Sequence, residues 1–354
     1  MIEDNQMGHP DSKPQREGLV RVADQPHMAI TDTLLEFPLP IGETVDYVTP
    51  ADRLFVLAHL GVPSIPLSEW KLEIVGRVNN PVSLSYEQIN QFPIRRVACV
   101  HQCAGNPFDP TQPSRTIANV EWEGVLLRDV LSRAGIRAGA DYVWAFGLDC
   151  GTLQVGDFKS EPQQHYVKDI PLDYILTAEV LLATRLNGQP LSEKHGFPVR
   201  LVVPGFYGTN SVKWLCRIEL ADRRADGLFT KDLYNDVDPV TGKSSPVWKL
   251  GPDSLIVEPT DKSEITNTDV EIIGWAWSHT EIHVVEVSTN DGATWEKAKV
   301  KPRKDLSWQQ FSCNWHPPGS GVYHLQSRAV DVEGNVQPMA QTRNAVHRIA
   351  VTVS

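Results

Sequence analysis

The sequence predicts two folded units, an α+β domain with a mixed sheet over residues 46–250 and an all-β immunoglobulin-like sandwich over residues 251–354. Its 354 residues exceed the usual size of one hydrophobic core. Up to about residue 250, short apolar strands are mixed with a few helical segments, and beyond it the pattern is nearly all short alternating strands. Residues 1–45 are rich in Pro, Asp and Gln and predict an irregular N-terminal arm.

The elements of the first domain are predicted from apolar spacing. Residues 70–76 alternate apolar and polar side chains, which favours a half-buried strand. The segment from Ser85 to Pro93 predicts a short helix, because Ser85 and Gln88 have the spacing of a capping box and the proline ends it. Residues 124–135 have helical spacing and end on a glycine. Further strands are predicted at 142–149, 199–204 and 212–220.

The second domain is predicted from its alternation and its turns. Four segments alternate apolar and polar residues, at 270–277, 282–288, 308–315 and 321–330. Asn290-Asp-Gly is a hairpin signal that follows the second of them. Cys313 is the one thiol of this domain, so the sandwich is expected to have no disulfide between its sheets.

Composition excludes some classes of function. A formal net charge of −11 argues against a nucleic-acid partner, because no basic excess exists to neutralise phosphates. The five cysteines form an odd set without disulfide-like spacing. No apolar run approaches the roughly 20 residues that span a bilayer, and residues 1–30 are polar, without a secretory signal. These observations predict a cytoplasmic chain without membrane contact.

The segment Cys99-Val-His101-Gln-Cys103 runs into Ala-Gly-Asn and is the first candidate for chemistry. On a strand, alternate residues face the same side, so the three odd-numbered side chains could form a tripod of metal ligands. The alternative is that Cys99 and His101 pack in the core and only Cys103, at the turn, is special. A structural zinc site usually needs four ligands, and the sequence has no second Cys/His pair.

A second candidate runs from His195 to Leu215. A loop with Gly205 and Gly208 can bring its backbone close to a phosphate, and positive side chains surround it in the sequence. These side chains are His195, Arg200 and Lys213. The alternative is a solvated loop with scattered bases.

Together these segments resemble the molybdenum-cofactor domain of sulfite oxidases and eukaryotic-type nitrate reductases, over roughly residues 45–350. The family's Cys-Ala-Gly-Asn stands at residues 103–106, its Asn-Gly-Gln-Pro-Leu at 187–191 and its His-Gly-Phe-Pro-Val-Arg at 195–200. Ser-Val-Lys-Trp-Leu follows at 211–215. Segments 287–295 and 329–338 resemble the family's C-terminal dimerisation sandwich.

The resemblance implies a sulfite-oxidase-type fold and a molybdenum–molybdopterin cofactor. Cys103 would be the thiolate on molybdenum, and soft sulfur donors suit such a metal. Tyr234 would be the active-site tyrosine. The implied cofactor contacts are His59, Asp149 on the pterin, and His195, Arg200 and Lys213 on the phosphate. No haem is expected in this chain, because the His-Pro-Gly-Gly motif of the family's cytochrome module is absent.

The expected substrate pocket departs from the family. Leu57 stands where sulfite oxidases carry an arginine, and Pro107-Phe108 replaces an Arg-Arg pair. A site that desolvates a small anion must return charge-assisted hydrogen bonds, each worth about 1.5–3 kcal/mol. The candidates to compensate are His101, Arg115 and Arg343.

The leading hypothesis is a homodimeric oxidoreductase that oxidises sulfite, a small oxyanion, to sulfate and passes electrons to an external acceptor such as a cytochrome. The second hypothesis keeps the cofactor and reduces an oxo-donor substrate, a sulfoxide or an N-oxide, because Leu57 and Phe108 suit a less charged ligand. The third is a non-catalytic dimeric scaffold whose cysteines hold zinc or nothing.

Overall fold

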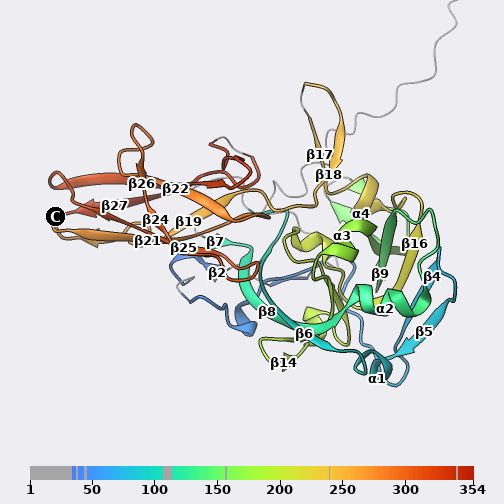
Figure 1. Ribbon diagram of the computed structural model, residues 1–354. Helices are drawn as coiled ribbons and strands as arrows, with labels where there is room; N and C mark the ends of the chain where they lie inside the picture. The colour runs from blue at the N-terminus through green and yellow to red at the C-terminus, as the bar shows by residue number, and fades with distance from the viewer. Residues whose placement is uncertain are drawn as a thin grey trace, which may run out of the picture.

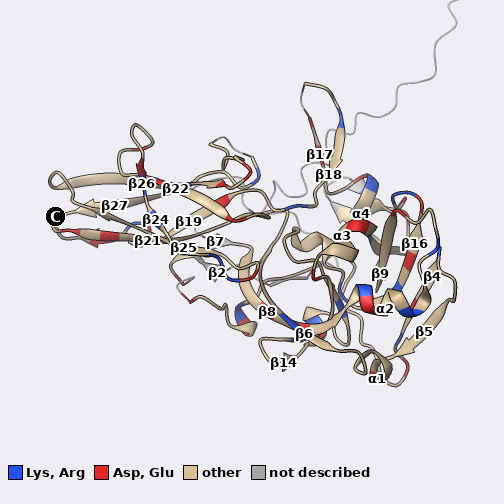
Figure 2. Cartoon of the chain, in the orientation of Figure 1, with Lys and Arg blue, Asp and Glu red and all other residues tan. Residues whose placement is uncertain are grey.

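The computed structural model describes residues 34–36, 39–43, 46–106, 114–155, 158–238, 240–339 and 342–354. Figure 1 shows two lobes: a larger one that holds the helices, and a smaller all-β lobe, β19 to β27, that extends to one side. Lys and Arg are interspersed with Asp and Glu along both lobes (Figure 2). No helix of the described ranges is long and apolar enough to cross a membrane.

The first sheet of the larger lobe has the strand order β12-β9-β16-β4-β5. Strands β16 and β4 are parallel and the other pairs are antiparallel, so the sheet is mixed. Its inner face forms the largest apolar cluster, which includes Leu72, Ile74 and Ile218. The strands are β4 (Lys71–Gly76), β5 (Val82–Ser85), β9 (Tyr142–Gly151), β12 (Gln164–Pro171) and β16 (Leu215–Ala221).

The second sheet has the order β14-β13-β8-β6, and β15 also pairs with β13. Strand β6 is at the edge of this sheet. Its last residue, Gln102, is followed directly by the turn that contains Cys103. The strands are β6 (Ile94–Gln102), β8 (Ile117–Leu126), β13 (Leu181–Leu186), β14 (Gln189–Pro190) and β15 (Arg200–Val202).

The described α-helices are few and short, so the larger lobe is richer in strand than the α+β expectation. The capping box at the start of the first helix is confirmed, since Ser85 and Gln88 make both reciprocal hydrogen bonds. The second helix begins three residues later than predicted, because residues 124–126 extend β8 and pair with β13. The helices are α1 (Tyr86–Ile89), α2 (Leu127–Ala134), α3 (Leu172–Thr177) and α4 (Leu228–Lys231).

Short elements complete this lobe. Within the predicted N-terminal arm, residues 34–36 and 39–40 pair as strands, and the rest of residues 1–40 lies outside the described ranges. The strand pairs are β1 (Leu34–Glu36) with β3 (Val56–Ala58), β2 (Leu39–Pro40) with β7 (Ser114–Arg115), β10 (Gln154–Val155) with β11 (Phe158–Lys159), and β17 (Asn235–Val237) with β18 (Ser244–Pro246). The 3-10 turns are η2 (Ile41–Glu43), η3 (Ala51–Arg53), η4 (Glu193–His195) and η5 (Gly208–Asn210).

The smaller lobe is a two-sheet sandwich. One sheet has the order β19-β21-β25-β24 and the other β20-β27-β26-β22-β23, and both contribute to one apolar cluster. The predicted turn at Asn290-Asp-Gly joins β22 to β23, with positive φ at Asp291 and Gly292. The strands are β19 (Asp253–Glu258), β20 (Glu264–Ile265), β21 (Val270–Trp277), β22 (Ile282–Ser288), β23 (Glu296–Lys297), β24 (Lys299–Val300), β25 (Gln309–Trp315), β26 (Gly321–Asp331) and β27 (His347–Val353).

A buried polar network joins the two lobes at the end of β6. The Gln102 amide nitrogen donates to Asp253 Oδ2 at 2.9 Å and to Asn344 Oδ1 at 3.0 Å. Its amide oxygen accepts a 2.9 Å hydrogen bond from the Trp277 indole. Buried polar groups are tolerated when each has a hydrogen-bond partner, and the Gln102 side chain is the partner of three such groups.

Replacing Gln102 with leucine is therefore expected to destabilise both lobes. The change leaves buried partners of the amide unsatisfied, at about 1–3 kcal/mol for each. We expect the free energy of unfolding to fall by about 2–5 kcal/mol, measured by denaturant unfolding. The exposed Gln91→Leu is the matched control, and equal stability of the two variants would contradict this account.

Candidate active site

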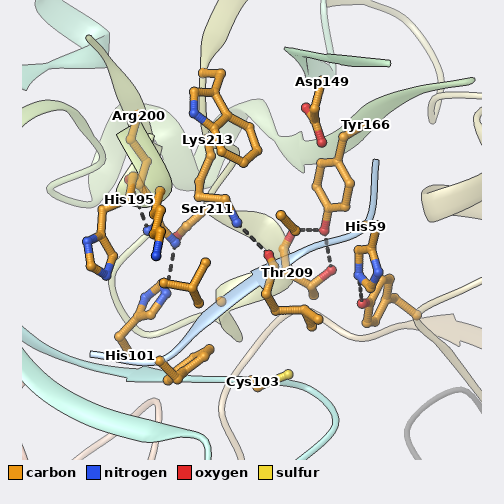
Figure 3. Close-up of a pocket in the computed structure, with 18 residues that line it drawn as sticks. His59, His101, Cys103, Asp149, Tyr166, His195, Arg200, Thr209, Ser211 and Lys213 are labelled. Carbon is orange, nitrogen blue, oxygen red and sulfur yellow. Dashed lines mark hydrogen bonds between the residues drawn. The ribbon is translucent and has the colours of Figure 1, made fainter. Parts of the chain in front are cut away.

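A cavity in the larger lobe collects most of the predicted site residues. Figure 3 shows His101, Arg200 and His195 toward one end and Asp149, Tyr166 and His59 toward the other, with Cys103 between them. The predicted residues that line it are His59, His101, Cys103, Asp149, His195, Arg200, Lys213 and Tyr234.

Cys103 is held by the turn that follows β6. Its backbone N–H donates to the Thr116 carbonyl at 2.9 Å, and the Asn106 N–H donates to the Cys103 carbonyl at 3.1 Å. The Gly105 N–H points at the sulfur, 3.3 Å away. Burial raises the pKa of this thiol, and the Gly105 N–H acts in the opposite direction. The turn thus aims the sulfur into the cavity and supplies one donor that favours a thiolate.

The three odd-numbered side chains of the segment do not form a metal tripod. Cys99 is 1% exposed in an apolar cluster, and burial raises its thiol pKa to about 12. His101 stacks on Phe55 with ring centroids 5.5 Å apart. Among the described residues, no group of three His, Cys, Asp or Glu side chains is arranged to hold a metal ion. The tripod and zinc alternatives therefore find no support, and Cys99 packs in the core.

One end of the cavity is cationic. Arg200 is 5% exposed, and its Nη2 donates to Nε2 of His101 at 2.8 Å. Burial lowers the pKa of Arg200 to about 10, which leaves the guanidinium charged at neutral pH. Burial and the charge of Arg200 hold the pKa of His101 well below its ordinary value. His101 is thus a neutral acceptor for Arg200 and supplies no compensating positive charge of its own.

Lys213 and His195 extend this cationic end. Lys213 donates to the Leu57 carbonyl and lies 4.8 Å from the Trp214 ring centroid. Burial lowers its pKa, and the charge of Arg200 acts in the same direction. His195 ends η4, where its Nδ1 lies 2.8 Å from Ser192 Oγ. The charged Arg200 and two further basic side chains, Lys213 and His195, therefore lie together where the sequence predicted an anion site.

Asp149 is the one carboxylate among the described residues that line the cavity. It is 4% exposed, and its Oδ1 has no hydrogen-bond partner in the described part of the chain. The carboxylate folds over Gly147, where an added Cβ would lie 2.2 Å from Oδ1, so the Gly-Leu-Asp sequence has a steric reason. Burial raises the pKa of Asp149, against the nearby charge of Lys213.

His59 and Tyr234 meet although they are far apart in sequence. His59 Nε2 lies 2.6 Å from the Tyr234 hydroxyl, and its ring stacks on Phe229 with centroids 5.3 Å apart. Burial, with the charge of Lys213, lowers the pKa of His59 to about 3, and burial raises that of Tyr234 well above its ordinary value. The pair is therefore neutral at physiological pH.

The residues predicted for the substrate pocket are placed less favourably. Leu57 lines the cavity as a partly buried apolar side chain. Arg343 is not among the described lining residues: its Nε donates to the Ala104 carbonyl at 2.8 Å and its Nη1 pairs with Asp236 at 2.7 Å. The backbone of Arg115 pairs in β7 with β2, and its side chain, like Pro107-Phe108, lies outside the described residues.

Sequence reasoning missed several lining residues. The Tyr166 hydroxyl lies 2.7 Å from Thr209 Oγ1, and Ser211 and Trp214 also border the cavity. The Gly-Thr-Asn-Ser run was the available signal for Thr209, whereas the strand that carries Tyr166 has no distinctive pattern. Of the two predicted loop glycines, only Gly208 lines the cavity. The positive-φ Gly205 lies instead against His279, which an added Cβ would meet at 2.9 Å.

Two domain families match the chain. Residues 59–229 match the oxidoreductase molybdopterin binding domain, and residues 244–352 match the molybdenum-cofactor oxidoreductase dimerisation domain. The first match contains the cavity residues apart from Tyr234 and those that precede His59.

Relatives agree with these matches. The chain is 32% identical to mitochondrial sulfite oxidase of Rattus norvegicus, over 89% of this chain and 63% of that protein. It is 30% identical to sulfite oxidase of Gallus gallus, over 82% and 68%, and 32% identical to an NADH nitrate reductase of Brassica napus, over 76% and 33%. The sulfane dehydrogenase SoxCD of Paracoccus pantotrophus has a similar structure, with a TM-score of 0.78 and 25% identity, over 99% of this chain and 93% of that one.

The chain therefore belongs to the sulfite oxidase family of molybdenum oxidoreductases. Its cofactor is molybdenum–molybdopterin. The chain spans 63% and 64% of the length of the rat and human sulfite oxidases that it matches.

The cavity fits that cofactor on its own chemistry. Two buried polar atoms at its wall, Asp149 Oδ1 and Arg200 Nε, have no hydrogen-bond partner among the described residues. Such atoms are costly unless a ligand satisfies them. A phosphate suits the cationic end, a pterin ring the Asp149 end, and a soft metal the Cys103 thiol between them. Arg200, His195 and Lys213 would hold the phosphate.

Removing the buried guanidinium is expected to loosen the cofactor. Arg200→Met deletes a charge-assisted interaction worth about 1.5–3 kcal/mol, which lowers affinity about 10-fold or more. The measurement is molybdenum per chain after prolonged dialysis. The exposed Arg223→Met is the control, and equal retention in both variants would show that Arg200 does not hold the cofactor.

The neutral His59 makes the fold sensitive to acid. The folded chain keeps this imidazole neutral down to about pH 3, whereas the unfolded chain protonates it below the ordinary histidine pKa of 6.5. The unfolded state then binds more protons, so stability falls as the pH drops from 6.5 toward 3, by up to about 1.4 kcal/mol per pH unit.

His59→Gln is expected to reduce that slope. The free energy of unfolding of the full chain is measured with urea at several pH values between about 5 and 7. His316→Gln, at an exposed histidine, is expected to leave the slope as in the parent chain. A His59→Gln slope equal to the parent's would contradict the neutral buried state.

Proposed function

We propose that this chain catalyses the two-electron oxidation of sulfite to sulfate and passes the electrons to a separate acceptor. One observation carries the proposal: the Cys103 thiol, the neutral His59–Tyr234 pair and the cationic Arg200 end border a single cavity. The similarity to sulfite oxidases supports it. Sulfite and water give sulfate, two protons and two electrons.

The residues of the chain have separate tasks in this proposal. When bound, the molybdenum cofactor supplies the two-electron couple and the transferable oxygen. Cys103 ligates the metal, and the Asp149 and Arg200 ends hold the two ends of the cofactor. The Tyr234 hydroxyl has one donor and two acceptor positions, so it can contact a substrate oxygen and His59 together. Because that pair is neutral, it orients the anion without binding the product tightly by charge.

The partners follow from the same family. We propose a homodimer through the smaller lobe, since residues 244–352 match a domain family named for dimerisation. We also propose an external electron acceptor such as a cytochrome.

A second candidate function is favoured by the apolar wall at Leu57. Arg343, a candidate to replace the missing arginines, is paired with Asp236 and bonded to the Ala104 carbonyl. A cavity with fewer free cations suits a less charged substrate, such as a sulfoxide, an N-oxide or a sulfane sulfur of the kind named for SoxCD.

Steady-state assays separate the two candidates. We expect the molybdenum-loaded chain to oxidise sulfite with ferricyanide as acceptor. Turnover of a sulfoxide, an N-oxide or a persulfide without sulfite oxidation would overturn the sulfite proposal and support the second candidate.

Cys103→Ser tests the proposed metal thiolate. We expect at least about 100-fold lower turnover, because a serine oxygen is a harder and less suitable donor for this metal. Pterin fluorescence should remain, since Asp149 and Arg200 are intact. Cys313→Ser, in the smaller lobe, is the matched control, and comparable turnover in the two variants would contradict the role of Cys103.

A further inference from the structure

Lys168 is a fully buried lysine behind Tyr234, outside the cavity. It lies on β12 with a relative exposure of 0%, and its Nζ donates to the Phe229 carbonyl of α4 at 2.9 Å. The same ammonium lies 5.3 Å from the centroid of the Tyr234 ring. Lysines are almost never fully buried unless they are paired, because the ammonium loses its hydration. A lysine retained here therefore calls for a function.

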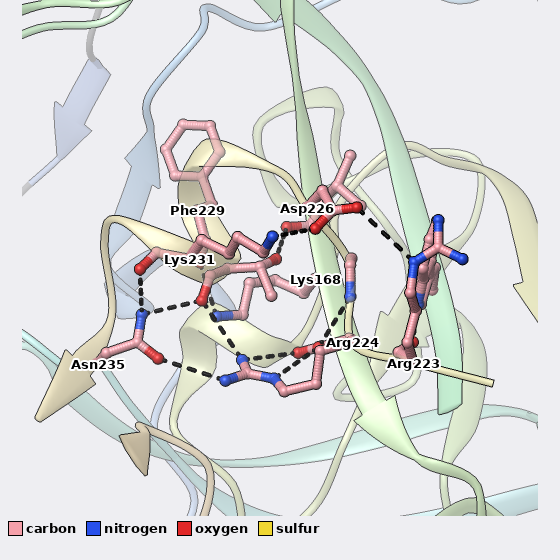
Figure 4. Close-up of polar contacts among 12 residues, drawn as sticks. Lys168, Arg223, Arg224, Asp226, Phe229, Lys231 and Asn235 are labelled. Carbon is pink, nitrogen blue, oxygen red and sulfur yellow. Dashed lines mark hydrogen bonds and ion pairs between the residues drawn. The ribbon is translucent and has the colours of Figure 1, made fainter. Parts of the chain in front are cut away.

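The charges around Lys168 do not neutralise it. Asp169, the next residue of β12, is bound by both ends of the Arg224 guanidinium, with Nε to Oδ2 at 2.8 Å and Nη2 to Oδ1 at 3.1 Å. The Ala225 N–H donates to the same carboxylate at 3.1 Å. When Lys168 is protonated, two cations and one carboxylate leave one net positive charge behind Tyr234. Figure 4 shows Lys168 and Arg224 side by side beneath α4.

Hydrogen bonds to β12 and within the segment itself hold the residues around Tyr234. The Thr230 hydroxyl donates to the Val167 carbonyl at 2.9 Å, and the Asn235 amide donates to the Thr230 and Leu233 carbonyls, each at 2.9 Å. Tyr234 itself has a φ of 56°, a left-handed conformation that is uncommon for an aromatic residue. Such a backbone persists only when its surroundings hold it.

We propose that Lys168 is a positioning residue for Tyr234. Its ammonium attracts the face of the phenol ring and fixes the Phe229 carbonyl, so that the Tyr234 hydroxyl stays 2.6 Å from His59 Nε2 at the cavity wall. The inference rests on the proposed function in one respect, that Tyr234 acts on the substrate. It adds a residue, Lys168, whose positive charge as well as its shape fixes the position of the Tyr234 ring.

The charge dependence gives the idea a pH signature. Burial lowers the pKa of Lys168 to about 7, with the charge of Asp169 opposing the shift and that of Arg224 adding to it. Its facing neighbours do not change charge there: His59 is neutral above about pH 3, and the pKa of Tyr234 lies well above its ordinary value. The attraction to the ring is therefore present below about pH 7 and weakens as the pH rises through that value.

Three variants test the proposal in the molybdenum-loaded chain, with kcat and KM measured from about pH 6 to 9. We expect Lys168→Met to lower kcat about 3- to 30-fold at pH 6, the range that a cation–π contact accounts for. Lys168→Arg restores most of kcat and makes its decline above about pH 7 shallower than in the parent enzyme, because a guanidinium stays charged. The cavity residues Lys213 and Asp149, each with a pKa of about 7, titrate in every variant. Ionisation of the substrate is the same for all variants, so only the differences between them are read.

Lys231→Met is the matched control. This lysine is on α4, with a side chain 58% exposed and paired with Asp226, and its loss should leave kcat and the pH profile unchanged. Molybdenum content is measured in every variant, so that a loss of cofactor is not read as a loss of positioning.

A second readout needs no turnover. With 13Cε-labelled lysine in the full holoenzyme, the resonance that is missing from Lys168→Arg should titrate near pH 7. A Lys168 resonance that titrates only above about pH 9, or equal pH profiles for Lys168→Arg and the parent, overturns the proposal. A chain that does not oxidise sulfite overturns the proposed function alone, because the titration is read independently and the variants are then compared on the substrate that is turned over.

Discussion

Positive charge removed from water is the constraint on which the active site depends. Arg200 is nearly buried, Lys213 lies beside it, and Asp149 is the one carboxylate among the described cavity residues. The chain offsets part of the cost with neutral partners, since His101 accepts from Arg200 and the Trp122 ring lies 5.0 Å from its guanidinium. An anionic cofactor supplies the negative charge that these neutral partners lack. Arg200 is held in β15, and Lys213 lies on the segment between η5 and β16.

Local motifs made part of this site predictable. Cys103, His195, Arg200 and Lys213 stand in short segments whose residue types already indicate a metal ligand and an anion site. His59 and Tyr234 are 175 residues apart. The family resemblance assigned each of them to the site, but their contact was not predicted. Tyr166 and Lys168 were not anticipated, because β12 alternates weakly and their roles arise from α4 packing over it. The late start of α2 has the same origin, a strand pairing between β8 and β13 that spacing alone does not contain.

Cys99, His101 and Cys103 alternate along one segment, yet tertiary contacts place their side chains in different surroundings. Cys99 is bridged to Leu306 of the smaller lobe and packs in the apolar cluster, whereas His101 turns to Arg200. Cys103 alone lies beyond the strand, where the turn leaves its sulfur facing the cavity. The positions considered for substrate-binding arginines differ in the same way. Leu57 is an apolar part of the cavity wall, and Arg343 bonds to the Cys103 turn instead of facing the substrate space.

The Cys103 turn is built from both lobes, and this bears on how such a protein can change over evolutionary time. Asn106 of the turn donates to Asp253 at 3.3 Å, and Arg343 Nε donates to the Ala104 carbonyl. The smaller lobe is thus part of the scaffold of the Cys103 turn. Recombination that exchanged one lobe for that of a distant homologue would have to carry these side chains along. A transplanted smaller lobe without Asp253 and Arg343 would leave the Cys103 turn without these two contacts.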